Sequence, residues 1–403
     1  MRIAQVAPLY ESVPPKLYGG TERVVSYLTE ELVRQGHDVT LFASGDSVTK
    51  ARLVPQCQQA LRLDSQSVDQ LAPHILMLEQ VIKQAEEFDI LHFHIDYLHF
   101  PFSRRQKTPH LTTLHGRLDI PELAPLYREF VEMPVVSISN AQRTPLPWLN
   151  WQMTVYHGLP LNLYRLQEKP EQYLAFLGRI SPEKGVDRAI EIARRSGTKL
   201  RIAAKVDRAD RDYFKGVIEP LLNQPFVEFI GEISDREKNE FLGNAFALLL
   251  PIDWPEPFGM VMIEAMACGT PVIAFRRGSA PEVIDEGVTG FIVRTVDEAV
   301  EAVKRVSTLD RRICRKVFEQ RFNVTRMAED YLRIYERLRE AVPAESTAAS
   351  VSVQPGVSPF RKLGEKAILN FPMNSDAAQD LIDGRFEALR IRAQGIAATC
   401  ENN

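Results

Sequence analysis

Two carboxylates eight positions apart mark the part of the chain whose residue types and spacing are best suited to bind a ligand. Glu256 follows a short apolar run, 245–251, that we predict to be a buried strand. Glu264 falls in a stretch rich in Met, Ala and Ile that we predict to be a helix, because Gly and Pro follow it. The amides of Phe258 and Gly259 are at the electropositive start of that helix. Ligands of open α/β sheets bind outside the carboxyl ends of the strands, so we expect a ligand site here.

Two cations form a second candidate group. In the segment LGRISPEKGVDRAI, Arg179 follows a predicted strand and Lys184 precedes a predicted helix. Positive charge at such a turn stabilises the negative charge that builds on a phosphate oxygen as a bond to it breaks. The alternative is that both are surface cations in an ordinary turn.

Together the two segments resemble the motifs of the retaining glycosyltransferases of family 4, E-x7-E and G-R-x-x-x-x-K-G. The resemblance implies an α/β protein of the GT-B fold, with two Rossmann-like domains facing across a cleft. It implies that Glu256 lies beside the donor sugar, near its reacting carbon, and that Glu264 accepts hydrogen bonds from the ribose hydroxyls. Arg179 and Lys184 then form a diphosphate clamp, completed by the amides at the start of the helix.

The resemblance also places residues of the first domain at this cleft. Gly19 and Gly20 precede a helix predicted from Thr21, where glycines let backbone amides approach phosphate or sugar oxygens closely. His115 ends a predicted strand and, in the family, a His at this point contacts the donor sugar. The alternative for His115 is a structural residue whose hydrogen bonds are satisfied within the protein. Glu256, His115, Arg179 and Lys184 are therefore the expected catalytic residues.

Two further positions have two open interpretations each. Asn140 lies where the family has a polar residue near the acceptor and donor pocket, but Asn is also a favourable helix N-cap. After the segment KLRIAA the family often has a glycine-rich turn, where this chain has Lys205, Val206 and Asp207. Lys205 either adds a charge towards the nucleotide or is simply exposed. The expected binding residues are Gly19, Gly20, Asn140, Arg179, Lys184, Lys205, Phe258, Gly259 and Glu264.

Two groups of residues suggest a metal, but we expect none. His92, His94, Asp96 and His99 alternate along one strand and its continuation, and the family uses no metal. The sequence DRD at 210–212 is similar to a metal-binding motif of another glycosyltransferase fold, but here we predict it to be a solvated helix start. No other cofactor is expected.

Composition excludes several classes of protein. The chain has 403 residues, 25% of them charged, and a net charge of −4, so it is a soluble globular protein without attraction to nucleic acid. Cys57, Cys268, Cys314 and Cys400 are scattered, which indicates neither a zinc site nor a disulfide framework. No apolar run is long enough to span a membrane and no signal peptide begins the chain, which favours a cytoplasmic location. The basic residues Arg104, Arg105 and Lys107 leave peripheral contact with the inner face of a membrane as an alternative.

Alternating strand and helix patterns predict four regions. A Rossmann-like acceptor domain covers 1–165, and a Rossmann-like donor domain covers 166–320. The family places a helix, 321–341, back on the first domain. Residues 342–403 are a linker and a tail, with a predicted amphipathic helix at 376–397. The tail is expected to cap a homodimer, recruit a partner or be disordered.

The expected activity is retaining transfer of a hexose from a nucleotide-diphosphate sugar, of the UDP-glucose or GDP-mannose type, to an acceptor hydroxyl. The acceptor is a carbohydrate, a lipid-linked sugar or a small molecule, and the sequence does not distinguish them. The alternative is a sugar phosphorylase or a nucleotide-sugar epimerase on the same fold. A binding module without catalysis is disfavoured, because each expected donor-side residue is present.

Overall fold

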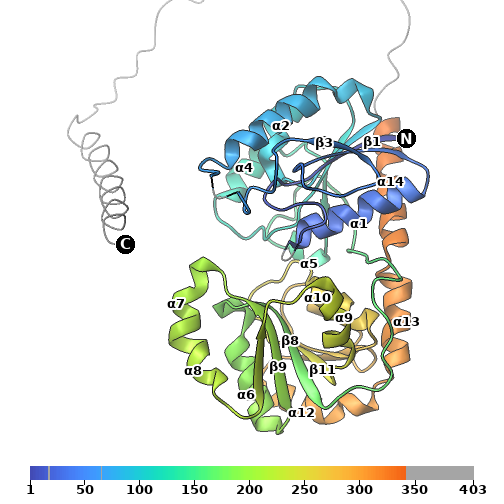
Figure 1. The fold of residues 1–403 in the computed structure, drawn as a ribbon. Coiled ribbons are helices and arrows are strands. Elements are labelled where there is room, and N and C mark those ends of the chain that lie inside the picture. Colours follow the sequence, from blue (N-terminus) through green and yellow to red (C-terminus); the bar gives the residue numbers. More distant parts are fainter. Residues whose placement is uncertain (17–18, 65, 342–403) are drawn as a thin grey trace, which may run out of the picture. The chain divides into compact units, whose positions relative to one another are not determined.

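The computed structural model describes residues 1–16, 19–64 and 66–341, which contain two parallel β-sheets, each flanked by helices (Figure 1). The first sheet has the strand order β3-β2-β1-β4-β5-β6-β7. Its strands are β1 (Arg2–Val6), β2 (Asp38–Ala43), β3 (Arg52–Pro55), β4 (Ile90–Phe93), β5 (His110–Thr113), β6 (Val135–Ser137) and β7 (Trp151–Thr154). The inner strands β1, apart from Arg2, and β4 are buried on both faces, as expected of a parallel sheet covered by helices.

The second sheet has the order β10-β9-β8-β11-β12-β13. Its strands are β8 (Tyr173–Arg179), β9 (Lys199–Lys205), β10 (Val227–Gly231), β11 (Ala247–Leu250), β12 (Val272–Phe275) and β13 (Gly290–Val293). In both sheets the order reverses beside the first strand, β1 or β8. Such a reversal is the point where an open sheet leaves a crevice at its carboxyl edge. The predicted fold class, two parallel-sheet α/β domains, is confirmed.

The helices that cover the first sheet in the described chain are α1 (Gly20–Arg34), α2 (Leu71–Lys83), α3 (Phe100–Ser103), α4 (Leu123–Glu129) and α5 (Asn140–Arg143). The second half has α6 (Val186–Ser196), α7 (Arg211–Tyr213), α8 (Glu219–Leu222), α9 (Asp235–Gly243), α10 (Met260–Ala267), α11 (Ala280–Val283), α12 (Val296–Arg305) and α13 (Arg311–Arg321). The last described helix, α14 (Val324–Glu340), packs against α1.

Helix α14 is part of the core of the first half. Met327, Tyr331, Ile334 and Tyr335 are buried with Ile3, Val24, Leu28 and Ile90 in one cluster. The chain therefore returns to the first sheet after completing the second, and Figure 1 shows α13 and α14 (both orange) running from the second half to the first. This helix was predicted at nearly these residues, from apolar side chains at helical spacing.

Several elements differ from the sequence expectation. The helix predicted near 210–222 is confirmed, but it is not α-helical throughout: α7, a π-helical turn at Phe214–Ile218 and α8 follow one another without interruption. Gly216 and Pro220 favour the wider turn, because Gly lowers helix propensity and Pro lacks an amide hydrogen. The short strands β3, β7 and β13 and the helices α3, α4, α12 and α13 were not predicted. The proposed domain boundary at 165 falls in the connection between β7 and β8.

No helix in the described part of the chain is long and apolar enough to cross a membrane. The linker and tail predicted for 342–403, with their amphipathic helix and Cys400, lie outside the described residues.

Candidate functional site

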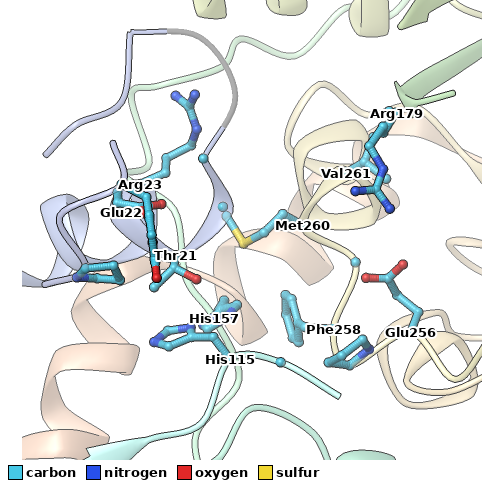
Figure 2. A pocket seen from close by; sticks show the side chains of 18 of the residues that line it. Thr21, Glu22, Arg23, His115, His157, Arg179, Glu256, Phe258, Met260 and Val261 are labelled. Carbon is cyan, nitrogen blue, oxygen red and sulfur yellow. The ribbon is translucent and has the colours of Figure 1, made fainter. Parts of the chain in front are cut away.

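A cavity of ≈ 740 Å³ lies at the carboxyl edges of the two sheets and is lined by residues from both. Figure 2 shows Thr21, Glu22 and Arg23 from the start of α1 on one side, and Arg179 and Glu256 on the other. His115, His157 and Phe258 lie between these groups. The predicted site residues that line the cavity are Gly19, Gly20, His115, Arg179, Lys184, Lys205, Glu256, Phe258, Gly259 and Glu264. The fold thus brings together every predicted site residue except Asn140.

Glu256 and Lys184 form a partly buried ion pair, with 2.6 Å between Lys184 Nζ and Glu256 Oε2. Trp254 donates its indole N–H to the same carboxylate oxygen at 2.9 Å. The ammonium of Lys184 also lies 4.6 Å from the centre of the Trp254 ring, which is cation–π distance. One short contact therefore connects the two sequence motifs, and the indole fixes both charges in place.

Arg179 is the second cation of the cavity wall, and carboxylates surround it. Its guanidinium lies 2.7 Å from Glu183, 3.7 Å from Asp207 and 3.6 Å from Asp210. Lys205 pairs with Asp207 at 3.0 Å, so neither of its two interpretations from the sequence describes it fully: it lines the cavity but is paired. The interpretation of DRD at 210–212 as a solvated helix start is wrong for Asp210, whose side chain is largely buried against Arg179.

The start of α10 offers backbone donors to the cavity. Gly259, at φ 74°, is the N-cap of α10, and within the described chain no side chain caps this end of the helix. The first amides of a helix have no intrahelical partner and carry partial positive charge, so they attract anions. A side chain at Gly259 would meet Met262 Cε at 2.8 Å, and the left-handed backbone independently favours glycine. Phe258 is buried immediately before this end.

Glu264 lies on α10 with 3% of its surface exposed. Tyr164 donates its hydroxyl to Glu264 at 3.3 Å, and Lys238 Nζ lies 3.2 Å from the same oxygen. Lys238 also pairs with Asp235 at 3.2 Å, and Asp235 pairs with Arg23 of α1. This series of charges connects the two halves at the cavity. It fixes the position of the Glu264 carboxylate, whose oxygens accept hydrogen bonds.

His115 lies two residues beyond β5, at the floor of the cavity. Its Nε2 is 2.9 Å from Nδ1 of His94, and its ring stacks with His157 at 5.4 Å between centroids. Burial lowers the pKa of His115 to about 3, so the ring is neutral at physiological pH. A neutral ring can exchange hydrogen bonds with hydroxyls but does not hold a phosphate by charge.

The four residues that suggested a metal are separated by the fold. The rings of His92 and His94 are 4.1 Å apart, whereas His99 stacks on Phe93 at 3.7 Å and bonds to Ser103 and Thr112. Within the residues that the structure describes, no group of three or more His, Cys, Asp or Glu side chains is arranged to hold a metal ion.

Asn140 does not line the cavity, and both interpretations of it are corrected. The N-cap of α5 is Ser139, whose hydroxyl accepts from the Gln142 amide. The amides of Asn140 and Ala141 instead donate to the carboxylate of Glu282, on α11 of the second half, at 2.8 and 2.6 Å. Asn140 therefore belongs to a contact between the halves, beside the cavity.

The cavity residues that sequence reasoning missed include Arg23, His157, Lys238 and Trp254. Arg23 and Trp254 lie close to predicted site residues in the sequence, whereas His157 and Lys238 reach the cavity from segments that no motif identifies. The sequence contains one weak indication for Trp254: an aromatic residue two positions before Glu256, in a Pro-rich loop, can bury its ring only close to Glu256.

Comparison with known proteins gives two family matches. The family described as "Glycosyl transferases group 1" matches residues 165–321, and "Glycosyltransferase Family 4" matches residues 18–158. The first match covers the second sheet, and the second match covers the first sheet apart from β1; the two meet in the connection between the sheets.

Two of the similar proteins match along most of their length. The N-acetyl-alpha-D-glucosaminyl L-malate synthase of Bacillus anthracis is 26% identical over 361 residues, which covers 79% of this chain and 93% of the relative. The glycogen synthase of Mycobacterium tuberculosis is 26% identical over 364 residues, covering 77% and 86%. Among solved structures, Anabaena HepE in complex with UDP-glucose has a TM-score of 0.63 at 20% identity, covering 84% of this chain and all of the other. This structural likeness shows a common fold.

Proposed function

Because the chain is a glycosyltransferase similar to those of family 4, with the GT-B fold, we propose that it transfers a hexose from a nucleotide-diphosphate sugar to an acceptor hydroxyl, with retention and without a metal. One observation carries this proposal: Glu256 and Lys184 touch at 2.6 Å in a cavity that also exposes the uncapped start of α10. The carboxylate suits a sugar, and the cation and the helix start suit a diphosphate. A cytoplasmic location is part of the proposal.

In the proposed complex the diphosphate lies between Arg179, Lys184 and the first amides of α10. As the bond between the anomeric carbon and the β-phosphate oxygen breaks, negative charge grows on that oxygen, and these groups stabilise it. They supply the positive charge for which other transferases use a metal ion. Glu264, held by Tyr164 and Lys238, accepts hydrogen bonds from the ribose hydroxyls.

The position of the two carboxylates bears on how a retaining transfer would proceed. Double displacement needs a carboxylate nucleophile beside the anomeric carbon and a second acid–base group close to it. Glu264 is assigned to the ribose, so Glu256 is the one signature carboxylate at the sugar. We therefore propose front-face attack, in which the leaving β-phosphate oxygen takes the acceptor proton as the acceptor oxygen bonds to the anomeric carbon. Glu256 positions the sugar and offsets its developing positive charge.

The acceptor is proposed to enter on the side of the cavity formed by the first half, where Tyr10, Leu71 and Tyr97 are partly exposed. Peripheral membrane contact gains no support from Arg104. Its guanidinium lies 2.6 Å from both Glu129 and Glu132, so its charge is neutralised locally. A carbohydrate, lipid-linked or small-molecule acceptor is compatible with this surface.

The test is isothermal titration with UDP, GDP and ADP, followed by their glucose, mannose and N-acetylglucosamine conjugates. HepE, which is similar in fold, was solved with UDP-glucose, so that donor comes first. We expect selective binding of one nucleotide, weakened at least tenfold in Arg179→Ala. Arg312→Ala is the matched control, because Arg312 pairs with Glu168 in an exposed ion pair and does not line the cavity.

Binding of no nucleotide by the unmutated protein would overturn the proposal in favour of a sugar phosphate substrate. Release of a sugar 1-phosphate from the donor in phosphate buffer, with no transfer to any hydroxyl, would instead support a phosphorylase.

A further inference from the structure

A buried series of hydrogen bonds connects helix α14 to the cavity through Gln5 of β1. Gln5 Nε2 donates to the hydroxyl of Tyr335 at 3.3 Å, and Gln5 Oε1 lies 2.8 Å from Nε2 of His94. His94 Nδ1 in turn lies 2.9 Å from Nε2 of His115, which lines the cavity. Gln5, His94 and Tyr335 are all at most 2% exposed, so no bulk water competes for these bonds.

A second arm leaves Tyr335 in the other direction. Its hydroxyl lies 2.7 Å from Nδ1 of His92, and Nε2 of His92 lies 2.7 Å from the hydroxyl of Thr113. That hydroxyl bonds to Tyr331 at 2.9 Å. Tyr331 and Tyr335 are thus both buried on the same face of α14, but Tyr335 alone contacts the arm that reaches the cavity.

The orientation of the Gln5 amide sets the direction of every bond in the first arm. With Gln5 Nε2 facing Tyr335, Gln5 Oε1 can only accept, so His94 must carry its proton on Nε2. Its Nδ1 is then a lone pair and must accept from Nε2–H of His115. A neutral imidazole has one ring proton, so Nδ1 of His115 carries none.

Charged forms of the rings do not disturb this assignment. Burial lowers the pKa of His115 to about 3 and lowers the pKa values of His92 and His94 well below their ordinary value. All three rings are therefore neutral at physiological pH, and their tautomers are decided by hydrogen bonds alone. Within the described residues, Nδ1 of His115 has no hydrogen bond, and the ring faces the cavity.

We propose that Gln5, His94 and Tyr335 are positioning residues that lock His115 in its Nε2–H tautomer, so that Nδ1 is offered to the cavity as a hydrogen-bond acceptor. Its partner is a hydroxyl of the transferred sugar, and in this respect the inference rests on the proposed function. A lone pair accepts from a hydroxyl and repels a phosphate oxygen. The network therefore orients the donor with its sugar, not its diphosphate, over His115, and it selects a sugar that has a hydroxyl at this point.

The first experiment measures the tautomer directly in the free protein. The ¹⁵N shifts of the His115 ring distinguish a protonated from an unprotonated Nδ1, and His115→Gln identifies the resonance. We expect a pure Nε2–H tautomer in the unmutated protein and a mixture in Gln5→Met, which removes the acceptor of His94. Tyr335→Phe should also give a mixture, because the Gln5 amide loses the partner that fixes its orientation.

Tyr331→Phe is the matched control. It removes one hydroxyl from the same buried face of α14, but Tyr331 lies at the end of the second arm, which does not reach the cavity. We expect its His115 spectrum to equal that of the unmutated protein. A protonated Nδ1 in the unmutated protein, or a pure Nε2–H tautomer in both Gln5→Met and Tyr335→Phe, would overturn the proposal.

The second experiment measures the consequence for binding, with UDP-glucose and its monodeoxy analogues as probes. We expect one analogue to bind about 3- to 10-fold more weakly than UDP-glucose, as for one lost hydrogen bond. In Gln5→Met the discrimination against the same analogue should fall to less than half of its value in the unmutated protein, whereas Tyr331→Phe should keep it. Equal discrimination in Gln5→Met and the unmutated protein would overturn the sugar contact.

The two experiments separate the inference from the proposed function. The tautomer is measured without any donor, so failure to bind UDP-glucose leaves that result standing and rejects only the donor. An unlocked tautomer in a protein that binds the donor rejects the network and leaves the transferase proposal intact.

Discussion

The contact between Lys184 and Glu256 concentrates the proposed chemistry in three side chains, because Trp254 bonds to the carboxylate and stacks with the ammonium. The two neighbouring charges have opposite proposed roles. Lys184 stabilises the negative charge on the leaving phosphate, and Glu256 stabilises the positive charge that develops on the sugar. Neutralising one of them should therefore separate binding from turnover.

Glu256→Gln keeps a carbonyl oxygen for the Trp254 indole but removes the negative charge. We expect affinity for the nucleoside diphosphate to stay the same or rise, because Lys184 loses its internal partner, while kcat falls by about 10²–10³. Titration calorimetry and steady-state rates measure the two effects. Asp253→Asn in the same loop is the control, since Asp253 makes an exposed pair with Arg277 outside the cavity. An unchanged kcat in Glu256→Gln would contradict the assigned role.

Asp96 is a second residue whose environment makes a sharp prediction. Burial raises the pKa of Asp96 to about 6, and its backbone is left-handed at φ 50°, which Asn tolerates well. The unfolded carboxyl ionises near its ordinary value, so the folded state binds more protons between about pH 4 and 6 and loses stability as the pH rises through that range. Above pH 6, Asp96→Asn should be more stable than the unmutated protein by about 2–3 kcal/mol.

Urea unfolding of both proteins at pH 4.5 and 7.5 checks this expectation for Asp96. The advantage of Asp96→Asn should shrink at the lower pH. A difference that does not depend on pH would show that the carboxyl ionises normally in the folded protein.

At the scale of elements, glycine positions the loop that carries Glu256. A side chain on Gly278, after β12, would collide with the backbone N and O of Glu256, and the amide of Ser279 donates to that same oxygen at 3.0 Å. The β12–α11 connection therefore supports the β11–α10 loop from behind. The motif alone gives no sign of this support.

Gly278→Ala should displace Glu256 and lower kcat at least tenfold, with a loss of about 2–4 kcal/mol of stability from backbone strain and overpacking together. Gly287→Ala separates the two causes. Gly287 is also left-handed, at φ 71°, but nothing within 4 Å would meet its new side chain. We expect Gly287→Ala to lose only about 1–2 kcal/mol and to keep kcat. Equal kinetic effects of both variants would contradict the proposed support.

The sequence predicts the buried strands and several long helices, but it misses the short elements and also α12 and α13, which have 10 and 11 residues. Strands β1, β8 and β9 and helices α1, α6 and α14 are found where apolar periodicity placed them. Strand β7 is half-exposed along its length, so it lacks the buried pattern that identifies a strand. The helix near 210–222 was predicted, but its π-helical turn at Phe214–Ile218 was not, because apolar spacing does not distinguish a π-turn from an α-turn.

At the scale of the whole molecule, the same division applies to the site. Arg179, Lys184, Glu256 and Glu264 could be predicted because each pair belongs to one short segment with fixed spacing. His157, Lys238, Trp254 and Arg23 could not, because they meet only when β7, α9, the β11–α10 loop and α1 have been placed in space. The prediction for Asn140 was wrong because its backbone amide donates to Glu282, a residue far away in sequence whose proximity the motifs do not indicate.

The histidines set a pH limit for the whole protein. Each of the eight has a pKa lowered mainly by burial. In the unfolded chain they gain protons below about pH 6.5, so the unfolded state binds more protons and stability falls with the pH. Each histidine that is charged only when unfolded contributes up to about 1.4 kcal/mol per pH unit, and Asp96 opposes this in part.

We therefore expect the free energy of unfolding to drop by several kcal/mol between pH 7.5 and 5.5, measured by urea titration at constant ionic strength. Asp96→Asn should show a steeper drop than the unmutated protein, because the opposing group is gone. A flat profile in both proteins would contradict the neutral, buried state of the histidines.

The return of α14 to the first sheet also has a consequence for synthesis. A ribosome releases residues 2–154, all the strands of the first sheet, long before Tyr331 and Tyr335 exist. Until then Gln5, His92 and Thr113 lack the partners that satisfy them, and Ile3 and Ile90 lack the apolar cover of Met327 and Ile334. The first half of the nascent chain therefore stays incompletely packed until the second half and α14 have been synthesised. We therefore expect chains that end before α14 to expose this surface and to be recognised by chaperones and proteases.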